Sequence, residues 1–274
     1  MRPPKSFPIG RRTVGEGRCF IIGEVGLAHD GSLQAAHAFV DAIAQAGADA
    51  AKFQCHLADH EPDGPMRVPH VAYQSRHEQW KRTAFNFSDW ASLRTHANLS
   101  GMEFLCSPFC VEAVKLLDPL VPAWKIPSGE VTNKALLEAV KATQKPVLLS
   151  TGMSDHQEIG SVVNRSYSGA PAVFFNCPLA ILQCTSVYPV APEQVGVNVM
   201  VQLRHYGTAV GLSDHSGTIY PGLAAVTLGC DVLEVHVKLS QWDQGPDASS
   251  SITPEQLKQL VEGVRFIETM KANP

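Results

Sequence analysis

The pattern that decides the fold begins with CFIIGEV at Cys19–Val25. This nearly continuous apolar run is typical of a strand that is buried on both faces of a parallel sheet. A segment with helical periodicity follows at Leu33–Ala46, preceded by the start signal Asp30-Gly31-Ser32 and followed by Gly47. A second apolar run, AAKFQC, follows at Ala50–Cys55. The order strand, helix, strand predicts two neighbouring parallel strands joined by a helical crossover.

The same unit repeats along the whole chain, at intervals of about 25 to 35 residues. The predicted strands are Cys19–Val25, Ala50–Cys55, Glu103–Cys106, Ala123–Pro127, Pro146–Ser150, Ile181–Thr185, Ala209–Leu212 and Val232–Val237. The predicted helices are Leu33–Ala46, Phe87–Leu99, Val111–Leu117, Lys134–Ala142, Asp155–Arg165, Glu193–His205, Ile219–Leu228 and Pro254–Met270. Eight such units in a chain of 274 residues favour an α/β fold of the closed (β/α)8 TIM barrel type over an open sheet.

The barrel accounts for nearly the whole chain as a single catalytic domain. We expect residues 1–18 to form an N-terminal arm or hairpin and residues 19–274 to form the barrel. The stretch Ala58–Thr83 is rich in Pro and His and is predicted to be a long loop that covers a site.

Composition excludes several classes of partner. The chain has 22 basic and 26 acidic side chains, a formal net charge of −4, so nucleic acid and anionic membrane are not expected as main partners. No apolar signal region follows the N-terminus and no segment is long and apolar enough to span a bilayer, which predicts a cytoplasmic protein. Seven cysteines, an odd number without framework spacing, are expected to be reduced thiols.

Polar residues recur at the carboxyl ends of the predicted strands, where barrel enzymes carry their functional groups. The strand bodies stay apolar, so we expect these polar groups to converge on one cavity. They are Glu24, Lys52, Gln54, Ser107, Lys125, Ser128, Glu130, Ser150, Thr151, Ser186, Tyr188, Ser213, His215 and His236.

Two of these groups are lysines, Lys52 and Lys125, and several others are serines. Ammonium and hydroxyl donors suit phosphate and carboxylate oxygens, which predicts a site for a small dianion or trianion. Two alternatives remain. Either lysine could instead form a salt bridge with Glu24 or Glu130, or it could act as a Schiff-base nucleophile.

His215 and His236 end adjacent predicted strands, so their imidazoles could share one divalent metal ion. Two protein ligands leave water positions open, which suits a Lewis acid that polarises a carbonyl. The alternative is that each is a hydrogen-bonded core histidine. The other nine histidines receive no role, and most are expected to be solvated.

Eight short motifs in order along the chain carry a family resemblance. They are Ile22-Gly23-Glu24-Val25-Gly26, Lys52-Phe53-Gln54, Ser107-Pro108-Phe109, Lys125-Ile126-Pro127-Ser128-Gly129-Glu130, Leu149-Ser150-Thr151-Gly152-Met153, Tyr188-Pro189, Ser213-Asp214-His215 and Gly245-Pro246-Asp247. From Cys19 to Glu268 the chain resembles the sialic acid synthase (N-acetylneuraminate synthase) family.

The resemblance implies a transferase that condenses phosphoenolpyruvate with the open-chain aldehyde of an N-acylated hexosamine type of sugar. The products would be phosphate and a 2-keto-3-deoxy sugar acid, such as a sialic acid-like nonulosonate. It also implies a divalent metal, Mn²⁺ with Mg²⁺ or Co²⁺ as alternatives, and a cytoplasmic homodimer.

The resemblance also assigns roles to individual residues. The phosphate of phosphoenolpyruvate would contact Lys125, Ser128, Ser150 and Ser213, and its carboxylate would contact Lys52, Ser107 and Ser186. The acceptor sugar would contact Glu24, Gln54, Tyr188 and Asp247. The catalytic groups would be Glu24, Glu130, which directs a water to C2, and the metal ligands His215 and His236.

The chain departs from the family at the acceptor side. Ala28 stands where the family usually has Asn, Val235 where it has Lys, and Ala248 where it has His. The family usually continues into a small antifreeze-like domain, which we expect this chain to lack, since it ends at Pro274. With that domain absent, the loop Ala58–Thr83 is expected to supply acceptor contacts. Its candidate donors are Arg67, Tyr73, Gln74 and Arg76.

Two other functions remain open from the sequence. A pyruvate-type aldolase would use Lys52 or Lys125 as a Schiff base and need no metal. A ligand-binding barrel could keep the anion pocket without turnover.

Overall fold

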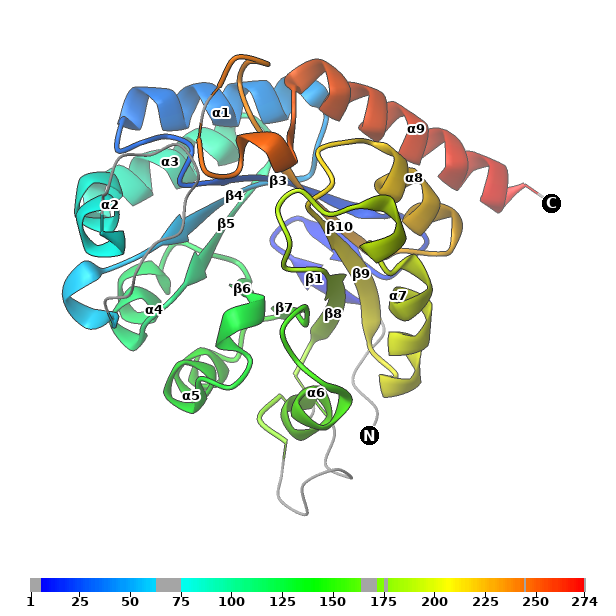
Figure 1. Ribbon diagram of the computed structural model, residues 1–274, viewed down its shortest axis with the longest axis horizontal. Coiled ribbons are helices and arrows are strands. Elements are labelled where there is room, and N and C mark those ends of the chain that lie inside the picture. The colour runs from blue at the N-terminus through cyan, green and yellow to red at the C-terminus, as the bar shows by residue number, and fades with distance from the viewer. Residues whose placement is uncertain (1–5, 63–74, 164–171, 175–176, 244, 274) are drawn as a thin grey trace.

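Parallel strands form a closed barrel with helices around it (Figure 1). The computed structural model describes residues 6–62, 75–163, 172–174, 177–243 and 245–273. The barrel strands are β3 (Phe20–Gly26), β4 (Ala50–Cys55), β5 (Glu103–Pro108), β6 (Trp124–Ile126), β7 (Val147–Ser150), β8 (Leu179–Cys184), β9 (Ala209–Asp214) and β10 (Val232–Val237). Each pairs in parallel with the next, and β10 pairs with both β9 and β3, which closes the ring. The predicted (β/α)8 barrel is confirmed.

Helices follow the strands in the predicted order. They are α1 (Leu33–Ala46), α2 (Arg76–Thr83), α3 (Phe87–Leu99), α4 (Val111–Leu117), α5 (Lys134–Ala142), α6 (His156–Val163), α7 (Val197–Leu203), α8 (Tyr220–Thr227) and α9 (Pro254–Ala272). Short 3₁₀ turns are η1 (Ala58–His60), η2 (Ser128–Glu130), η3 (Pro192–Gln194), η4 (Arg204–Tyr206) and η5 (Ala248–Ser250). A short strand, β11 (Ser251–Ile252), pairs with β10.

Local sequence explains where two of the helices begin and end. Ser32 accepts a hydrogen bond from the backbone N–H of Ala35, and Gly47 ends α1 in the left-handed conformation at φ 85°. The predicted helix Glu193–His205 is wrong in its first turn, because Gly196 adopts φ 74° and α7 begins only at Val197. The stretch predicted as one long loop contains η1 and α2, so that prediction is also wrong in part.

An antiparallel hairpin, β1 (Phe7–Ile9) and β2 (Arg12–Val14), closes the N-terminal end of the barrel. Phe7, Ile9 and Val14 are buried in one cluster with the apolar residues of the barrel interior. The backbone N–H of Arg11 donates to Glu103, at the start of β5, over 2.9 Å. The apolar hairpin residues fill the N-terminal end of the barrel, so the polar side chains gather at the carboxyl ends of the strands.

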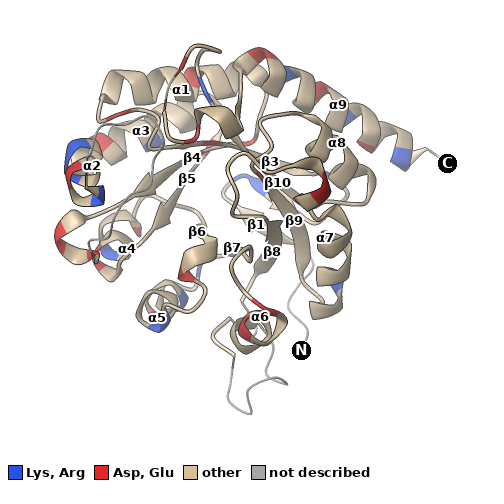
Figure 2. Cartoon of the chain, in the orientation of Figure 1, with Lys and Arg blue, Asp and Glu red and all other residues tan. Residues whose placement is uncertain are grey.

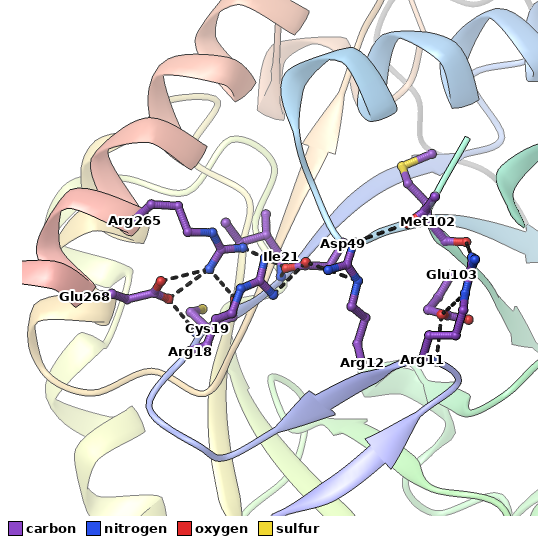
Figure 3. Close-up of polar contacts among 11 residues, drawn as sticks. Arg11, Arg12, Arg18, Cys19, Ile21, Asp49, Met102, Glu103, Arg265 and Glu268 are labelled. Atoms are coloured by element: carbon purple, nitrogen blue, oxygen red, sulfur yellow. Dashed lines mark hydrogen bonds and ion pairs between the residues drawn. The ribbon is translucent and has the colours of Figure 1, made fainter. Parts of the chain in front are cut away.

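A buried ionic network ties the hairpin side of the barrel to the last helix (Figure 3). Asp49 accepts a hydrogen bond from the backbone N–H of Ile21 over 2.9 Å. Its carboxylate also lies 2.7 Å from the guanidinium of Arg18 and 2.8 Å from that of Arg265 on α9. Arg265 contacts Glu268, which accepts from a backbone N–H at the start of the barrel. One carboxylate therefore joins three segments that are distant in sequence.

The distribution of charged residues and the state of the cysteines agree with what the composition predicted. In Figure 2 both acidic and basic residues lie on α2 and on α9. Among the described helices, none is both long enough and apolar enough to cross a bilayer. All seven cysteines are free, as the sequence predicted.

Removing the Asp49 carboxylate should destabilise the fold strongly. Asp49→Ala leaves a backbone donor and three guanidinium groups, those of Arg12, Arg18 and Arg265, without their buried partner, so we expect a loss of about 3–5 kcal/mol in the free energy of unfolding. The matched control is Asp41→Ala, because the Asp41 side chain is 50% exposed and pairs with His96 at the surface. That change should cost less than about 1 kcal/mol. Equal losses in urea unfolding would contradict this role of Asp49.

Candidate active site

The structure brings together the predicted strand-end side chains and Asp247, with the exception of Thr151, whose hydroxyl donates to the carbonyl oxygen of Leu182. They line one cavity of about 1120 Å³ at the carboxyl ends of the barrel strands. These residues are Glu24, Lys52, Gln54, Ser107, Lys125, Ser128, Glu130, Ser150, Ser186, Tyr188, Ser213, His215, His236 and Asp247. The volume lies slightly above the usual range of about 300–1,000 Å³ for a single small-molecule site, so two small substrates can be held at once.

The floor of the cavity is a buried cluster of charges. Glu234, from the middle of β10, lies between two lysines: its Oε1 is 3.4 Å from Lys125 Nζ and its Oε2 is 3.7 Å from Lys52 Nζ. The hydroxyl of Ser213 donates to Glu234 over 3.0 Å. Lys52 Nζ also lies 2.8 Å from Glu24 Oε2. Two ammonium groups and two carboxylates therefore face one another, and all four side chains are almost fully buried.

Burial and these carboxylates act in opposite directions on the two lysines. Burial alone would lower the pKa of Lys52, but Glu234 and Glu24 outweigh it and raise that pKa above its usual value. Burial lowers the pKa of Lys125, which Glu234 offsets only in part. Burial would raise the pKa of Glu234, yet Lys125 and Lys52 hold it well below its usual range. The site thus keeps Lys52 charged and depends on Glu234 for the charge of Lys125.

The sequence reasoning gave no role to Glu234. The sequence did contain an indication of this residue, because alternate side chains of a strand point to the same face. Glu234 and His236 are two residues apart and therefore point to the same face of β10. One of the predicted alternatives holds for Lys52, which does pair with Glu24. For Lys125 the partner is Glu234 and not the Glu130 that the sequence suggested.

Serine hydroxyls surround the lysines. Ser107 accepts from Lys52 Nζ over 3.1 Å. Ser128 accepts from the backbone N–H of Gly152 over 3.0 Å, so that N–H is already used inside the protein. A Cβ at Gly152 would lie 2.6 Å from the carbonyl oxygen of Cys184, and only glycine fits there. The hydroxyl of Ser150 is buried and has no hydrogen-bond partner in the described part of the chain. A ligand oxygen would satisfy it.

Other acidic and amide groups line the walls above this floor. Gln54 Nε2 donates to Glu24 Oε1 over 3.0 Å. Glu130 accepts from the amide of Asn133 over 2.7 Å, which fixes its carboxylate in the opening. Asp247 Oδ2 lies 3.9 Å from the imidazole Nδ1 of His236. These oxygens and amides can bind the hydroxyl groups of a polar ligand.

The two strand-end histidines fit a divalent cation. Burial, together with neighbouring His236, lowers the pKa of His215 to about 3, so its imidazole is neutral. Its Nδ1 lies 3.1 Å from the carbonyl oxygen of Thr185, to which it can only donate. The lone pair is then on Nε2, where Tyr188 presents its hydroxyl at 3.0 Å. The imidazole rings of His215 and His236 lie 5.2 Å apart, centroid to centroid.

These two imidazoles are the protein donors that the fold offers to a metal. Over the described ranges, no group of three or more His, Cys, Asp or Glu side chains has metal-binding spacing. A cation at His215 and His236 would take its remaining ligands from water or substrate oxygens, as the sequence predicted for a two-ligand site.

Of the other histidines that the structure describes, two are buried. His29 is buried and stacks on Phe85, with ring centroids 4.5 Å apart, and burial lowers its pKa to about 4. His56 is buried and lines the cavity. Of the predicted loop donors, Arg76 also lines the cavity. The others, Arg67, Tyr73 and Gln74, lie outside the described residues.

A family model named NeuB matches residues 39–274 of this chain. The chain belongs to the NeuB family. It is 35% identical over 265 residues to the N,N'-diacetyllegionaminic acid synthase of Legionella pneumophila, covering 92% of this chain and 73% of the relative. It is 32% identical over 276 residues to the N-acetylneuraminate-9-phosphate synthase of Homo sapiens, covering 97% and 74%.

A solved structure agrees with this assignment. The N-acetylneuraminic acid (sialic acid) synthetase of Leptospira borgpetersenii, in complex with citrate, superimposes with a TM-score of 0.84 at 27% identity. The alignment covers 98% of this chain and 91% of that chain. The predicted sialic acid synthase type of NeuB barrel, and the prediction that the chain is a synthase enzyme, are confirmed. The roles of individual residues stay predictions.

Glu234 should control the charge of Lys125 in this NeuB barrel. Glu234→Gln removes the carboxylate that raises the pKa of Lys125, so Lys125 should lose its proton at a lower pH than in the wild type. Sulfate binding, measured by calorimetry from about pH 7 to 10, should then weaken at lower pH in the variant. Sulfate does not titrate in this range, so the change reports on the protein.

The control for this experiment is Glu193→Gln. Glu193 is an exposed residue of η3 that does not line the cavity as described, so its variant should keep the wild-type pH profile. If sulfate binding to Glu234→Gln weakened at the same alkaline pH as in the wild type, the pKa of Lys125 would not depend on this carboxylate.

Proposed function

We propose that this protein condenses phosphoenolpyruvate with the open-chain aldehyde of an N-acylated hexosamine type of sugar. The products are phosphate and a 2-keto-3-deoxy sugar acid of the sialic acid-like nonulosonate class. Membership of the NeuB family and the names of the synthase relatives support the reaction class. The observation that carries the proposal is the floor of the cavity, where two buried lysines line the same space as the hydroxyl of Ser150, which has no hydrogen-bond partner among the described residues.

Phosphoenolpyruvate carries two anionic ends, and the floor offers a cation for each. We place its carboxylate on Lys52, Ser107 and Ser186, and its phosphate on Lys125, Ser128, Ser150 and Ser213. The raised pKa of Lys52 supports a permanently charged partner for the carboxylate. The hydroxyl of Ser150, which no described residue satisfies, supports an oxygen ligand on the phosphate side. Charge-assisted contacts of this kind are among the stronger hydrogen bonds in proteins.

The acceptor would lie above phosphoenolpyruvate. We place it against Glu24, Gln54, Tyr188 and Asp247, which also line the cavity. C3 of phosphoenolpyruvate attacks the aldehyde carbon, and the aldehyde oxygen gains a proton. Water then adds at C2, and the resulting hemiketal phosphate loses inorganic phosphate to leave the 2-keto group. The reaction needs no covalent bond to the enzyme.

We assign Glu130 the role of directing the water. Its carboxylate is held by Asn133 at 2.7 Å and lines the cavity, so it can accept a proton from a water that approaches C2. A divalent cation at His215 and His236, which we take to be Mn²⁺ with Mg²⁺ or Co²⁺ as alternatives, would polarise the aldehyde oxygen. We also propose, on the family resemblance, a cytoplasmic homodimer.

A pyruvate-type aldolase is the second candidate, and one observation favours it. Burial lowers the pKa of Lys125, as a Schiff-base lysine requires. Borohydride reduction in the presence of pyruvate separates the two functions, because an aldolase would become covalently labelled. The condensation proposed here requires an unlabelled protein that releases phosphate from phosphoenolpyruvate.

Lys125→Ala should weaken the phosphate side of the site. We expect a higher KM for phosphoenolpyruvate and a lower kcat for phosphate release with an aldehyde sugar, since a charge-assisted contact of about 1.5–3 kcal/mol is lost. The control, Lys115→Ala, changes a lysine whose side chain is 73% exposed and should behave as wild type. If the wild type releases no phosphate with any aldehyde sugar, the proposal is wrong and a ligand-binding barrel without turnover is favoured.

Removal of the metal should stop turnover and spare phosphoenolpyruvate binding. His215→Ala and His236→Ala should each abolish phosphate release and weaken Mn²⁺ binding, while phosphoenolpyruvate still binds through the lysines on other strands. His205→Ala, at an exposed surface position, serves as the control. An unchanged rate in protein stripped with EDTA would remove the cation from the mechanism.

A further inference from the structure

A buried imidazole and carboxylate lie in the cavity wall next to α2, outside the set of residues discussed for either substrate. His56 Nδ1 lies 2.7 Å from Glu61 Oε2, and the other oxygen of Glu61 accepts from the backbone N–H of Leu57 over 2.7 Å. The side chains of His56 and Glu61 are only 8% and 5% exposed. Both residues line the cavity.

Two aromatic rings hold the imidazole in place. The ring of Trp80, from α2, stacks on His56 with centroids 4.7 Å apart, and the ring of Phe109 stacks on it at 3.8 Å. Figure 1 shows α2 at the outer edge of the barrel, and its residues contact η1, which directly follows this histidine. The hydrogen bond to Glu61 and the two stacked rings together fix both the position and the orientation of His56.

One nitrogen of this fixed imidazole is left for a ligand. Glu61 occupies Nδ1, and no hydrogen bond links Nε2 of His56 to another residue within the described ranges. A carboxylate on one imidazole nitrogen fixes the tautomer, because Nδ1 must donate to it. In the neutral imidazole, Nε2 then carries the lone pair and can accept a hydrogen bond from a hydroxyl group.

The register of β4 sets the height of His56 in the cavity. Lys52, Gln54 and His56 are each two residues apart, and all three line the cavity. Lys52 belongs to the charged floor, and Gln54 bonds Glu24 in the layer above. His56 follows as the next layer toward the opening, where the part of the acceptor farthest from the reacting aldehyde would lie.

We propose that His56, held by Glu61, Trp80 and Phe109, is a specificity-determining residue that binds a hydroxyl group at the distal end of the acceptor sugar through Nε2. This inference rests on the proposed function. It assigns Glu61 as a positioning residue, which acts on the acceptor only through the imidazole. The contact is remote from the phosphoenolpyruvate site, so its loss should change acceptor binding alone.

The test compares two amide replacements of His56. The side-chain amide of His56→Asn lies as many bonds from the backbone as Nδ1, so this variant can keep the bond to Glu61 but lacks Nε2. The amide of His56→Gln matches Nε2 instead. We expect the KM for the acceptor to rise about tenfold in His56→Asn, the loss of one hydrogen bond, and to be partly restored in His56→Gln. The KM for phosphoenolpyruvate should stay within about twofold of wild type in both.

Glu61 provides an independent variant. Glu61→Ala should raise the acceptor KM. Glu61→Gln should raise it less, because its single amide oxygen can still accept from Nδ1 although its NH2 group then faces the backbone N–H of Leu57. The double variant His56→Asn with Glu61→Ala should be no worse than His56→Asn alone, because the two residues act through one contact. The matched control is His60→Ala: His60 lies four residues away, has a side chain 49% exposed, and does not line the cavity as described.

A panel of acceptors, each lacking one distal hydroxyl group, identifies the contact. The wild type should bind one member of the panel about tenfold more weakly than it binds the intact sugar. His56→Asn should bind that member and the intact sugar equally well, because the contact is already lost. An acceptor KM that is unchanged in His56→Asn, or equal rises in both KM values, would overturn the inference while the proposed function stands. A wild type without phosphate release would overturn both.

Discussion

Glu234 lies between Lys52 and Lys125 at the floor of the cavity, and the arrangement of the rest of the site depends on this contact. Each ammonium group loses several kcal/mol of solvation at such depth, and a nearby carboxylate is needed to compensate for it. Glu234 does so for both lysines at once, with Glu24 as a second partner for Lys52. The lysines therefore remain available as cations before any ligand enters.

This constraint explains the division of the barrel into two ends. The hairpin fills the N-terminal end with Phe7, Ile9 and Val14, so charged groups gather at the carboxyl ends of the strands. An anion that reaches the floor meets two lysine ammonium groups with two carboxylates beside them, and the hydroxyl of Ser150, which has no partner among the described residues. Higher in the cavity the groups change from cations to carboxylates, amides and imidazoles, which suit a neutral polyhydroxylated ligand.

Much of this could be predicted from the sequence, for a physical reason. Strands buried on both faces read as continuous apolar runs, so β4 and β10 were predicted with the bounds that the structure has. A parallel barrel directs the residues at its strand ends toward one opening, so Lys52, Lys125 and His236 could be placed together without any distance information. The barrel topology therefore predicted which residues lie close together in space, which the residue types alone could not.

The errors have physical causes as well. Helix α2 is short and lies in a stretch rich in Pro and His, although its capping box, Ser75 with Glu78, was a visible signal. The partners of Asp49 come from segments far apart in sequence, so no local pattern indicates that network. The sandwich of His56 between Trp80 and Phe109 is equally non-local. Contacts of this kind follow only once the barrel is closed.

The most direct test of the account is a crystal structure of the protein with phosphoenolpyruvate and Mn²⁺. The account predicts the phosphate oxygens within hydrogen-bonding distance of Lys125 Nζ and the Ser150 hydroxyl, and the carboxylate on Lys52 Nζ. It also predicts that Glu234 remains between the two lysines. Phosphoenolpyruvate bound in the reverse orientation, or outside this floor, would contradict it.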